Sequence, residues 1–541
     1  MGELRLVPAA VAVWAAAACV IVFGVRAAVV VVLLCAGSAA VWRVWGQMLM
    51  VAGLGAASTI VAWLRLRTAH RWDPAGEIAG TVAGAPKQIA SGGYLVRVQV
   101  AGVPSPTPVF TNEVPDDVVA GAQVVARGAV SESGVAGINP YAINGTVQAT
   151  GPPEGFARFA LHVRETFAAA VERTVGDHAQ GLIPGMVLGD TSLQSAGEQQ
   201  AYIDTGLSHL SAVSGANIAI VTAFAAVLAA AVGLGLRGRV VASASALLIY
   251  AALVGPDPSV LRASVTGLVG LTAVLASRQS EPVHALCLAV IALVLIDSDL
   301  AVHYGFALSV AATAGIVALF PLLYRALAKT GWPDILVRAL AVAVAADVAT
   351  MPIIALMAGR VSLVSVGANV LVAPVTGPVT VLGLAAAVLS LAPGGLEAVL
   401  LVVIEPLARW VRLVADVGAG LPVATINAAP LYVLVIYGWF LAGVLCGRPR
   451  MTLVVAVVCG VVVVKQPPAV ELDHLRAHVV ATKEDVEPVP PGTQLVVVLE
   501  HGRPHTRPVV TDQGIPVIFP NRDGVATIYP DGTQVLPRRA F

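Results

Sequence analysis

The stretch that decides how this chain folds runs from residue 209 to residue 221 and reads HLSAVSGANIAIV. The residues after it stay apolar almost to Leu236, as in a membrane-spanning helix. Its head, however, is polar or small, with His209, Ser211, Ser214, Gly215 and Asn217. On a regular helix the polar side chains of this segment would spread over roughly 220° of the circumference, which is too wide for one lipid-avoiding stripe.

This pattern predicts one of two arrangements. Either protein surrounds the helix, or the helix is broken near Ser214–Gly215 and its free backbone groups line a cavity, which is tolerated at membrane depth only against protein or water. Close packing is the simpler alternative, because Ser211, Gly215 and Ala219 recur at the spacing of a small-residue helix interface.

Composition predicts an integral membrane protein. Of its 541 residues, 57% are hydrophobic and 12% are charged, whereas about 25% of the residues of a soluble protein are charged. Apolar runs recur within residues 1–70 and again within 207–464, so we expect N-terminal transmembrane helices and then a larger transmembrane domain. The predicted fold class is a polytopic α-helical membrane protein.

The segment between these helical regions has a different character. Residues 71–155 hold five short β-rich stretches separated by turn residues, and Val96, Val98 and Val100 alternate with polar residues as in a half-buried strand. Five strands in this length predict an inserted small β-barrel, with an OB-fold as the candidate of matching size. Residues 156–206 have apolar residues at helical spacing and predict an amphipathic connector. Residues 465–541 predict a short, β-rich soluble tail.

Basic residues predict the orientation in the membrane. If the apolar segments cross alternately, seven basic residues fall on one side: Arg237, Arg239, Arg278, Arg325, Lys329, Arg448 and Arg450. Cytoplasmic loops are enriched in Lys and Arg. The barrel and the C-terminal tail are therefore predicted to be extracytoplasmic.

A charged stripe lies in the last third of the membrane domain. Glu405, Arg409, Arg412 and Asp416 fall within about 60° of arc on a helix. Ions in hydrocarbon are costly, so the stripe cannot face lipid. It faces the interior of a helix bundle, a water-filled passage, or the membrane interface if the helix lies flat.

Asp347 is a lone carboxylate in an otherwise apolar segment, AVAVAADVATMP. An intramembrane acid is a functional candidate, and the structural alternative is an ion pair with one of the arginines. No nucleotide-binding, hydrolase or zinc-ligand motif is present in the sequence. We therefore expect no cofactor, no metal site, no catalytic residue and no enzymatic activity.

The region 182–221, LIPGMVLGDTSLQSAGEQQAYIDTGLSHLSAVSGANIAIV, resembles the core of the ComEC competence family. These are polytopic proteins that pass transforming single-stranded DNA into bacteria. The resemblance rests on Leu188-Gly189-Asp190 and on Thr205-Gly206 through Ser214-Gly215. Asn217 stands where the family usually has histidine.

Three further segments resemble the family in the same order. They are PSVLRASVTG (258–267), which contains Arg262, YGFALSVAATAGIVAL (304–319), and VSLVSVGANVLVAPVTGPVTVLG (361–383), which contains Asn369. The resemblance implies a channel for DNA uptake in natural competence. It also implies single-stranded DNA, an external DNA receptor, a cytoplasmic ATP-driven motor and the lipid bilayer as partners, with further copies of the chain as an option.

The tail departs from many members of the family, which carry a metallo-β-lactamase-like nuclease domain. Its H-x-H-x-D-H ligand run does not occur within residues 465–541. The resemblance therefore implies the channel and not the nuclease. Two alternatives remain open: a transporter of another polyanion or small solute, or a membrane enzyme that uses Asp347, His209 and Glu405 as acid–base groups.

Overall fold

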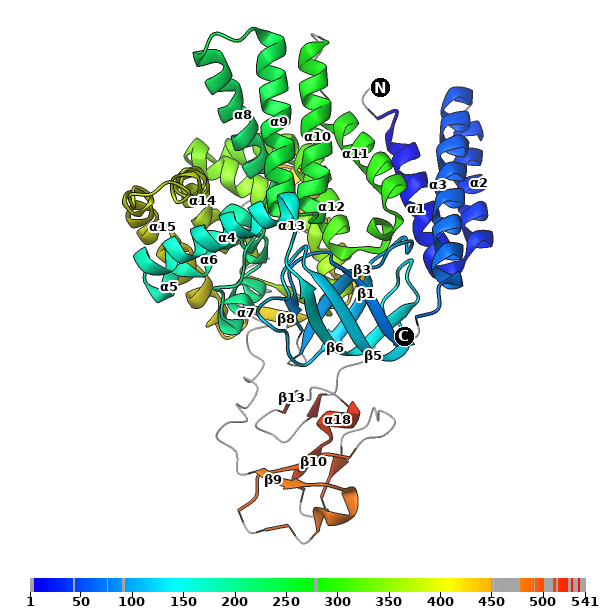
Figure 1. Ribbon diagram of the computed structural model, residues 1–541. Helices are drawn as coiled ribbons and strands as arrows, with labels where there is room; N and C mark the ends of the chain where they lie inside the picture. Colours follow the sequence, from blue (N-terminus) through cyan, green and yellow to red (C-terminus); the bar gives the residue numbers. More distant parts are fainter. Residues whose placement is uncertain are drawn as a thin grey trace. The chain divides into compact units, whose positions relative to one another are not determined.

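The computed structural model describes residues 4–41, 44–74, 76–89, 93–276 and 281–448, together with shorter stretches between residues 451 and 535. The chain forms two compact units, Met1–Pro449 and Arg450–Phe541. Helices dominate the first unit (Figure 1).

Six helices in the described part of the chain are long and apolar enough to cross a membrane. They are α3 (Trp45–Arg71), α9 (Leu236–Val254), α10 (Pro258–Leu275), α12 (Tyr304–Leu327), α13 (Asp334–Ala358) and α14 (Ser365–Leu389). Shorter apolar helices accompany them: α1 (Val7–Phe23), α2 (Val25–Val41), α8 (Gly215–Ala231), α11 (Pro282–Ile296) and α16 (Pro430–Leu445). The prediction of a mostly helical protein with several long apolar helices is thus confirmed.

The predicted inserted barrel is present. Its strands are β1 (Glu77–Val82), β2 (Lys87–Gln88), β3 (Tyr94–Gln99), β4 (Thr107–Thr111), β5 (Gln123–Glu132) and β6 (Tyr141–Gly151). Five of them close in the order β1-β3-β4-β6-β5-β1, with β4 and β6 parallel and the other neighbours antiparallel, while β2 extends the edge of β3. Val96 and Val98 point inward and Arg97 outward, because successive side chains of a strand alternate between its two faces. All five predicted strands are confirmed.

After the barrel the chain enters four helices that support the candidate site: α4 (Gly155–Thr174), α5 (Asp177–Gln180), α6 (Leu182–Leu188) and α7 (Ala196–Asp204). Every residue of α6 is buried. It packs so closely on α14 that a Cβ at Gly383 would lie 2.4 Å from Cγ2 of Val187. Only glycine fits there, so α6 is fixed at the centre of the first unit's main core.

Helix α15 (Glu397–Ala419) carries the charged stripe and is not among the apolar spans. One face is buried around Leu401, Ile404 and Ala408, and another exposes apolar side chains such as Val399 and Val417. Its coil is seen nearly end-on in Figure 1 while α8, α9 and α10 run along the page. Helix α15 therefore crosses the direction of these helices.

A short antiparallel pair, β7 (Arg360–Ser362) and β8 (Thr425–Asn427), links the start of α14 to the chain after α15. In the second unit, β9 (Ala477–Val480), β10 (Leu495–Val498), β11 (Val509–Val510) and β12 (Pro516–Ile518) form one sheet. A helical turn, α18 (Pro520–Asp523), and the hairpin of β13 (Thr527–Ile528) and β14 (Gln534–Val535) follow. The strands of this unit agree with the β-rich character predicted for the tail. The last part of the predicted transmembrane domain, residues 451–464, lies almost wholly outside the described residues.

Candidate functional site

The polar head of the 209–221 segment is a break in the helix. Ser208–Ser211 form a single 3-10 turn, the chain is extended at Ala212 and Ser214, and α8 begins at Gly215. Of the two arrangements predicted, the structure has the broken one. The backbone N–H groups of the first turn of α8 have no partners within the helix.

Ser214 does not cap this helix. Its hydroxyl donates to Oδ1 of Asn217 at 2.9 Å, and no side chain of the cap residue accepts from the first turn. The Asn217 amide, 3% exposed, donates to the Met186 carbonyl at 2.6 Å, and the Tyr250 hydroxyl donates to the Val187 carbonyl at 2.6 Å. These two side chains satisfy carbonyls at the end of α6 that helical bonding leaves free. Asn217 therefore ties α6 to α8.

Arg262 lies beside the start of α8. A Cβ built on Gly215 would lie 3.5 Å from a terminal nitrogen of the Arg262 guanidinium. The Nε–H of Arg262, from α10, donates to the Ser309 hydroxyl of α12 at 2.8 Å. The start of a helix carries partial positive charge, so a fixed guanidinium next to it creates a position that favours an anion.

Two other residues of the segment differ in exposure. His209 is exposed, with Nδ1 3.2 Å from the Gly206 carbonyl oxygen. The Ser211 hydroxyl is half-buried and accepts a hydrogen bond from the Gln194 amide at 3.1 Å. His209 is thus, with Ser208, an exposed side chain of the break that is free to meet a solute.

Asp347, Ser365 and Asn369 form a hydrogen-bonded cluster next to the loop that precedes α8. Ser365 donates its hydroxyl to Asp347 at 2.6 Å and accepts at its carbonyl from the Asn369 amide at 2.8 Å. The Tyr437 hydroxyl of α16 donates to the other oxygen of Asp347. The partners of Asp347 are hydroxyls, so the arginine ion pair considered from the sequence is not the arrangement found.

Gly206 joins this cluster to the signature segment. It has φ +69°, and a Cβ on it would lie 2.6 Å from Cβ of Ser365. A side chain would be excluded both by the left-handed backbone and by the contact. The Thr205–Gly206 turn, the start of α14 and Asp347 on α13 are therefore packed as one unit.

The charged stripe of α15 faces the connector helices. Glu405 accepts from the Gly176 N–H at 3.2 Å and from Arg409 at 2.6 Å. Arg412 pairs with Asp416 at 2.8 Å and also with Glu198 of α7. The side chain of Arg409 is 57% exposed and that of Arg412 only 21%. The stripe thus contains a half-buried arginine, Arg412, paired with two carboxylates, and a more accessible one, Arg409.

Glu198 was missed from the sequence, although a signal for it was present. Ser195 and Glu198 form a reciprocal capping box at the start of α7, which the spacing of serine and glutamate predicts. Gly181 approaches so closely that a Cβ there would lie 2.8 Å from a Glu198 oxygen. The long-range pairing with Arg412 has no local signal.

The connector between α11 and α12 was also missed. Asp299 accepts the Ile138 N–H at 2.6 Å and the Ser105 hydroxyl, which come from two loops of the barrel. Burial, together with the neighbouring Asp299, raises the pKa of Asp297, and burial lowers the pKa of His303. This connector attaches the barrel to the helices of the first unit.

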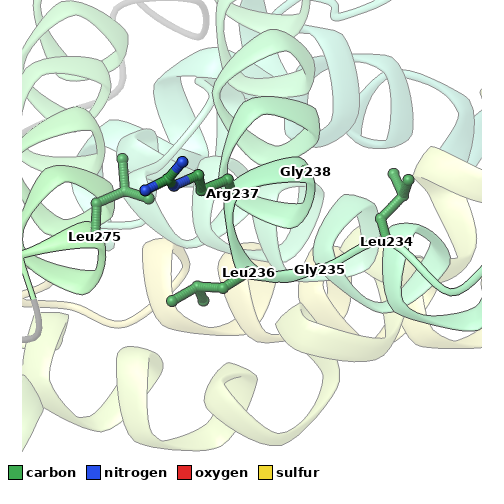
Figure 2. A pocket seen from close by; sticks show the side chains of 6 residues that line it. All are labelled: Leu234, Gly235, Leu236, Arg237, Gly238 and Leu275. Carbon is green, nitrogen blue, oxygen red and sulfur yellow. The ribbon is translucent and has the colours of Figure 1, made fainter.

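A shallow hollow lies apart from these residues, at the turn between α8 and α9 (Figure 2). Its lining is Leu234, Gly235, Leu236, Arg237, Gly238 and Leu275. Figure 2 shows Arg237 extending towards Leu275 of α10. None of the candidate residues lines this hollow. Among the described residues, no group of three or more His, Cys, Asp or Glu side chains could hold a metal ion.

Comparison with known proteins relates the helical region to one protein family. Residues 186–450 match the competence protein family, and they contain the α8 break, Arg262, Asp347 and the α15 stripe. ComE operon protein 3 of Bacillus subtilis (strain 168) is 25% identical over 229 residues, which are 42% of this chain and 29% of that protein. The alignment thus spans less than a third of the relative's length. No solved structure matches. Both findings support a ComEC-family competence protein.

Proposed function

We propose that this chain is a multi-pass protein of the cell membrane and conducts single-stranded DNA inward during natural competence. The family match and the six helices of membrane-spanning length and composition support this assignment. The main structural support for a DNA conduit is the position of Arg262. Its guanidinium is held beside the start of α8, which has no side-chain cap.

A DNA strand presents a column of phosphates, so a conduit needs cationic positions that bind each phosphate weakly. Arg262 and the first N–H groups of α8 supply one such position, and exposed His209 lies just before the break. Arg409 is a second candidate because more than half of its side chain is exposed, while Glu405 offsets its charge. Such partial compensation keeps a phosphate from being held too tightly.

The orientation and partners follow from the same proposal. The one-sided clustering of basic residues supports an orientation with the barrel and the tail outside the cytoplasm. An external receptor delivers DNA, and a separate ATP-driven motor supplies work, because the sequence contains no nucleotide-binding motif. The proposal gives this chain no hydrolytic step.

The test uses a transformable strain that lacks its own ComEC gene and carries this chain or its variants. Nuclease-resistant labelled DNA measures uptake, surface-bound label measures delivery, and immunoblotting measures the amount of protein in the membrane. Arg262→Ala should reduce uptake by about tenfold or more, since a hydrogen bond to a charged group contributes about 1.5–3 kcal/mol. Surface binding and protein amount should not change. Arg262→Lys should retain part of the uptake because it keeps the charge.

The matched control is Arg239→Ala, which removes an exposed arginine near the start of α9. Uptake equal to wild type in Arg262→Ala would contradict the phosphate-contact assignment. Failure of the wild-type chain to restore DNA uptake, combined with uptake of another labelled polyanion, would favour the alternative transport function.

A further inference from the structure

Asp347 has an environment that the conduit proposal leaves unexplained. It is the fourteenth of the 25 residues of α13, and 8% of it is exposed. Each carboxylate oxygen accepts one hydroxyl, from Ser365 of α14 and from Tyr437 of α16. The side chain is therefore buried near the middle of a helix long enough to cross a membrane.

No cation balances this carboxylate in the described part of the chain. The elements packed on α13 are α12, α14, α16 and β7. Helix α14 contains no titratable residue, and Tyr437 is the titratable group of α16 that faces Asp347. Arg325 and Tyr324 lie near the end of α12, where Tyr324 contacts Asp334 at the opposite end of α13 from β7.

The remaining charges close to α13 are already paired. Arg338 binds Asp334 and lies about 13 Å from Asp347 along the helix. Arg360 of β7 pairs with Asp204 at 3.5 Å. A carboxylate without a cation is strongly disfavoured in such a setting, and taking up a proton removes the charge.

Protonation would change the hydrogen bonds of the cluster. A charged carboxylate only accepts, so both hydroxyls donate to it, as observed. A protonated carboxyl also donates, and the two hydroxyl oxygens already in contact with it can accept that hydrogen bond. One of the two hydroxyls must then reverse and find another acceptor.

The cluster adjoins two features of the surrounding structure. Ser365 packs against Gly206 in the signature loop. Pro352, five residues after Asp347 in α13, has no N–H to donate to the carbonyl one turn earlier, which weakens the helix there. A change of hydrogen bonding at Asp347 would therefore occur next to the Ser365–Gly206 contact and next to the weakened turn of α13 at Pro352.

We propose that Asp347, Ser365 and Tyr437 form a proton-binding site whose occupancy sets the position of the Thr205–Gly206 loop at the head of α8. As a gate for DNA this inference rests on the proposed function, whereas proton binding and its effect on the loop do not. The ligand is a proton reaching the site from water, and no bond other than O–H is made or broken.

Proton binding is tested by infrared difference spectroscopy on the full chain in lipid nanodiscs, between low and high pH. The expected signal is a carboxylic-acid carbonyl band that shifts in D₂O and is lost in Asp347→Asn. Tyr437→Phe and Ser365→Ala should shift the band, because each removes one hydrogen-bond partner. Glu77→Gln, an exposed carboxylate of the barrel, is the matched control and should leave it unchanged. Persistence of the wild-type band in a folded Asp347→Asn protein, or an unshifted band in both Tyr437→Phe and Ser365→Ala, would overturn the proposal.

The effect on the loop is tested by thiol labelling. A single cysteine replaces exposed Ser208 in a chain whose five native cysteines have been changed. Because His209 titrates beside this position, the measurement is made with His209→Gln in all variants. The labelling rate should depend on pH with Asp347 present, and this dependence should be lost in Asp347→Asn. Equal pH dependence in both would refute the coupling. An intact band and labelling response without DNA uptake would instead contradict the DNA conduit alone.

Discussion

Two regions of this protein bury a carboxylate to nearly the same degree and compensate it differently. Glu198, 6% exposed, bonds the Ser195 N–H at 2.9 Å and pairs with Arg412 of α15. Asp347, 8% exposed, accepts hydrogen bonds from two neutral hydroxyls, those of Ser365 and Tyr437. Burial alone therefore does not distinguish a structural acid from a responsive one. We expect the charge of the hydrogen-bond partner to distinguish them. A neutral donor allows the carboxylate to take up a proton, whereas a fixed guanidinium stabilises its charged form.

The largest effect is expected where a compensating charge is removed. Arg412→Ala leaves Glu198 buried without its cation, at a cost of roughly 3–5 kcal/mol. The protein should be lost from the membrane or unfold at a much lower temperature in detergent. Adding Glu198→Gln should restore most of the stability, because glutamine can still bond the Ser195 N–H. A wild-type unfolding temperature in Arg412→Ala would show that the pair does not brace α7 on α15.

A smaller effect is expected at Asp299, which joins the barrel to the helices. Like Asp347, this carboxylate accepts hydrogen bonds from uncharged donors. Asp299→Ala removes the acceptor of the Ile138 N–H and the Ser105 hydroxyl, and should weaken attachment by about 2 kcal/mol. Proteolysis at the chain segments flanking the barrel should become faster while the helices remain folded. Asp116→Ala, on an exposed part of the barrel, serves as the control. Unchanged cleavage would place the attachment elsewhere.

Asp347→Asn should change stability little, by about 1 kcal/mol or less, because asparagine can accept one hydroxyl and donate to the other. Its unfolding temperature, measured beside that of Arg412→Ala, gives the most direct contrast between the two regions. A loss as large as that of Arg412→Ala would mean that the negative charge of Asp347 is itself structural.

The smallest stability change is expected for Arg409→Ala. This arginine is 57% exposed, and exposed ion pairs contribute about 0–1 kcal/mol. Thermal unfolding should be nearly unchanged, and uptake of labelled DNA should fall if Arg409 contacts phosphate. Normal uptake with normal stability would remove Arg409 from the conduit and leave Arg262 as its cation.

The sequence predicted the parts of this fold that local pattern encodes. Alternation around Val96 and Val98 predicted the barrel strands. The crowding of polar residues before Asn217 predicted either a helix surrounded by protein or a break near Ser214, and the structure has the break. Contacts between distant segments could not be read in this way. Arg412 and Glu198 are separated by more than two hundred residues, and neither spacing nor composition indicates that α15 lies against α7.

The candidate site was predictable to the same extent. The residues that carry the resemblance were identified from their motifs, including Arg262 and Asn369, but their partners were not. Tyr437 lies ninety residues after Asp347, in a segment without a distinctive motif. Asp299 lies in a connector whose acidic residues look like an ordinary polar turn, and its role depends on where the barrel docks.

The docking of the barrel has a mechanical consequence. The connector that holds Asp299 also accepts the Trp14 indole N–H at Ala301, and it leads directly into α12, where Ser309 holds Arg262. The barrel is closed and has its own core, so we expect it to respond to force as one body. A pull on the barrel would act on the connector through Asp299, and the connector is continuous with the helix whose Ser309 holds the Arg262 guanidinium.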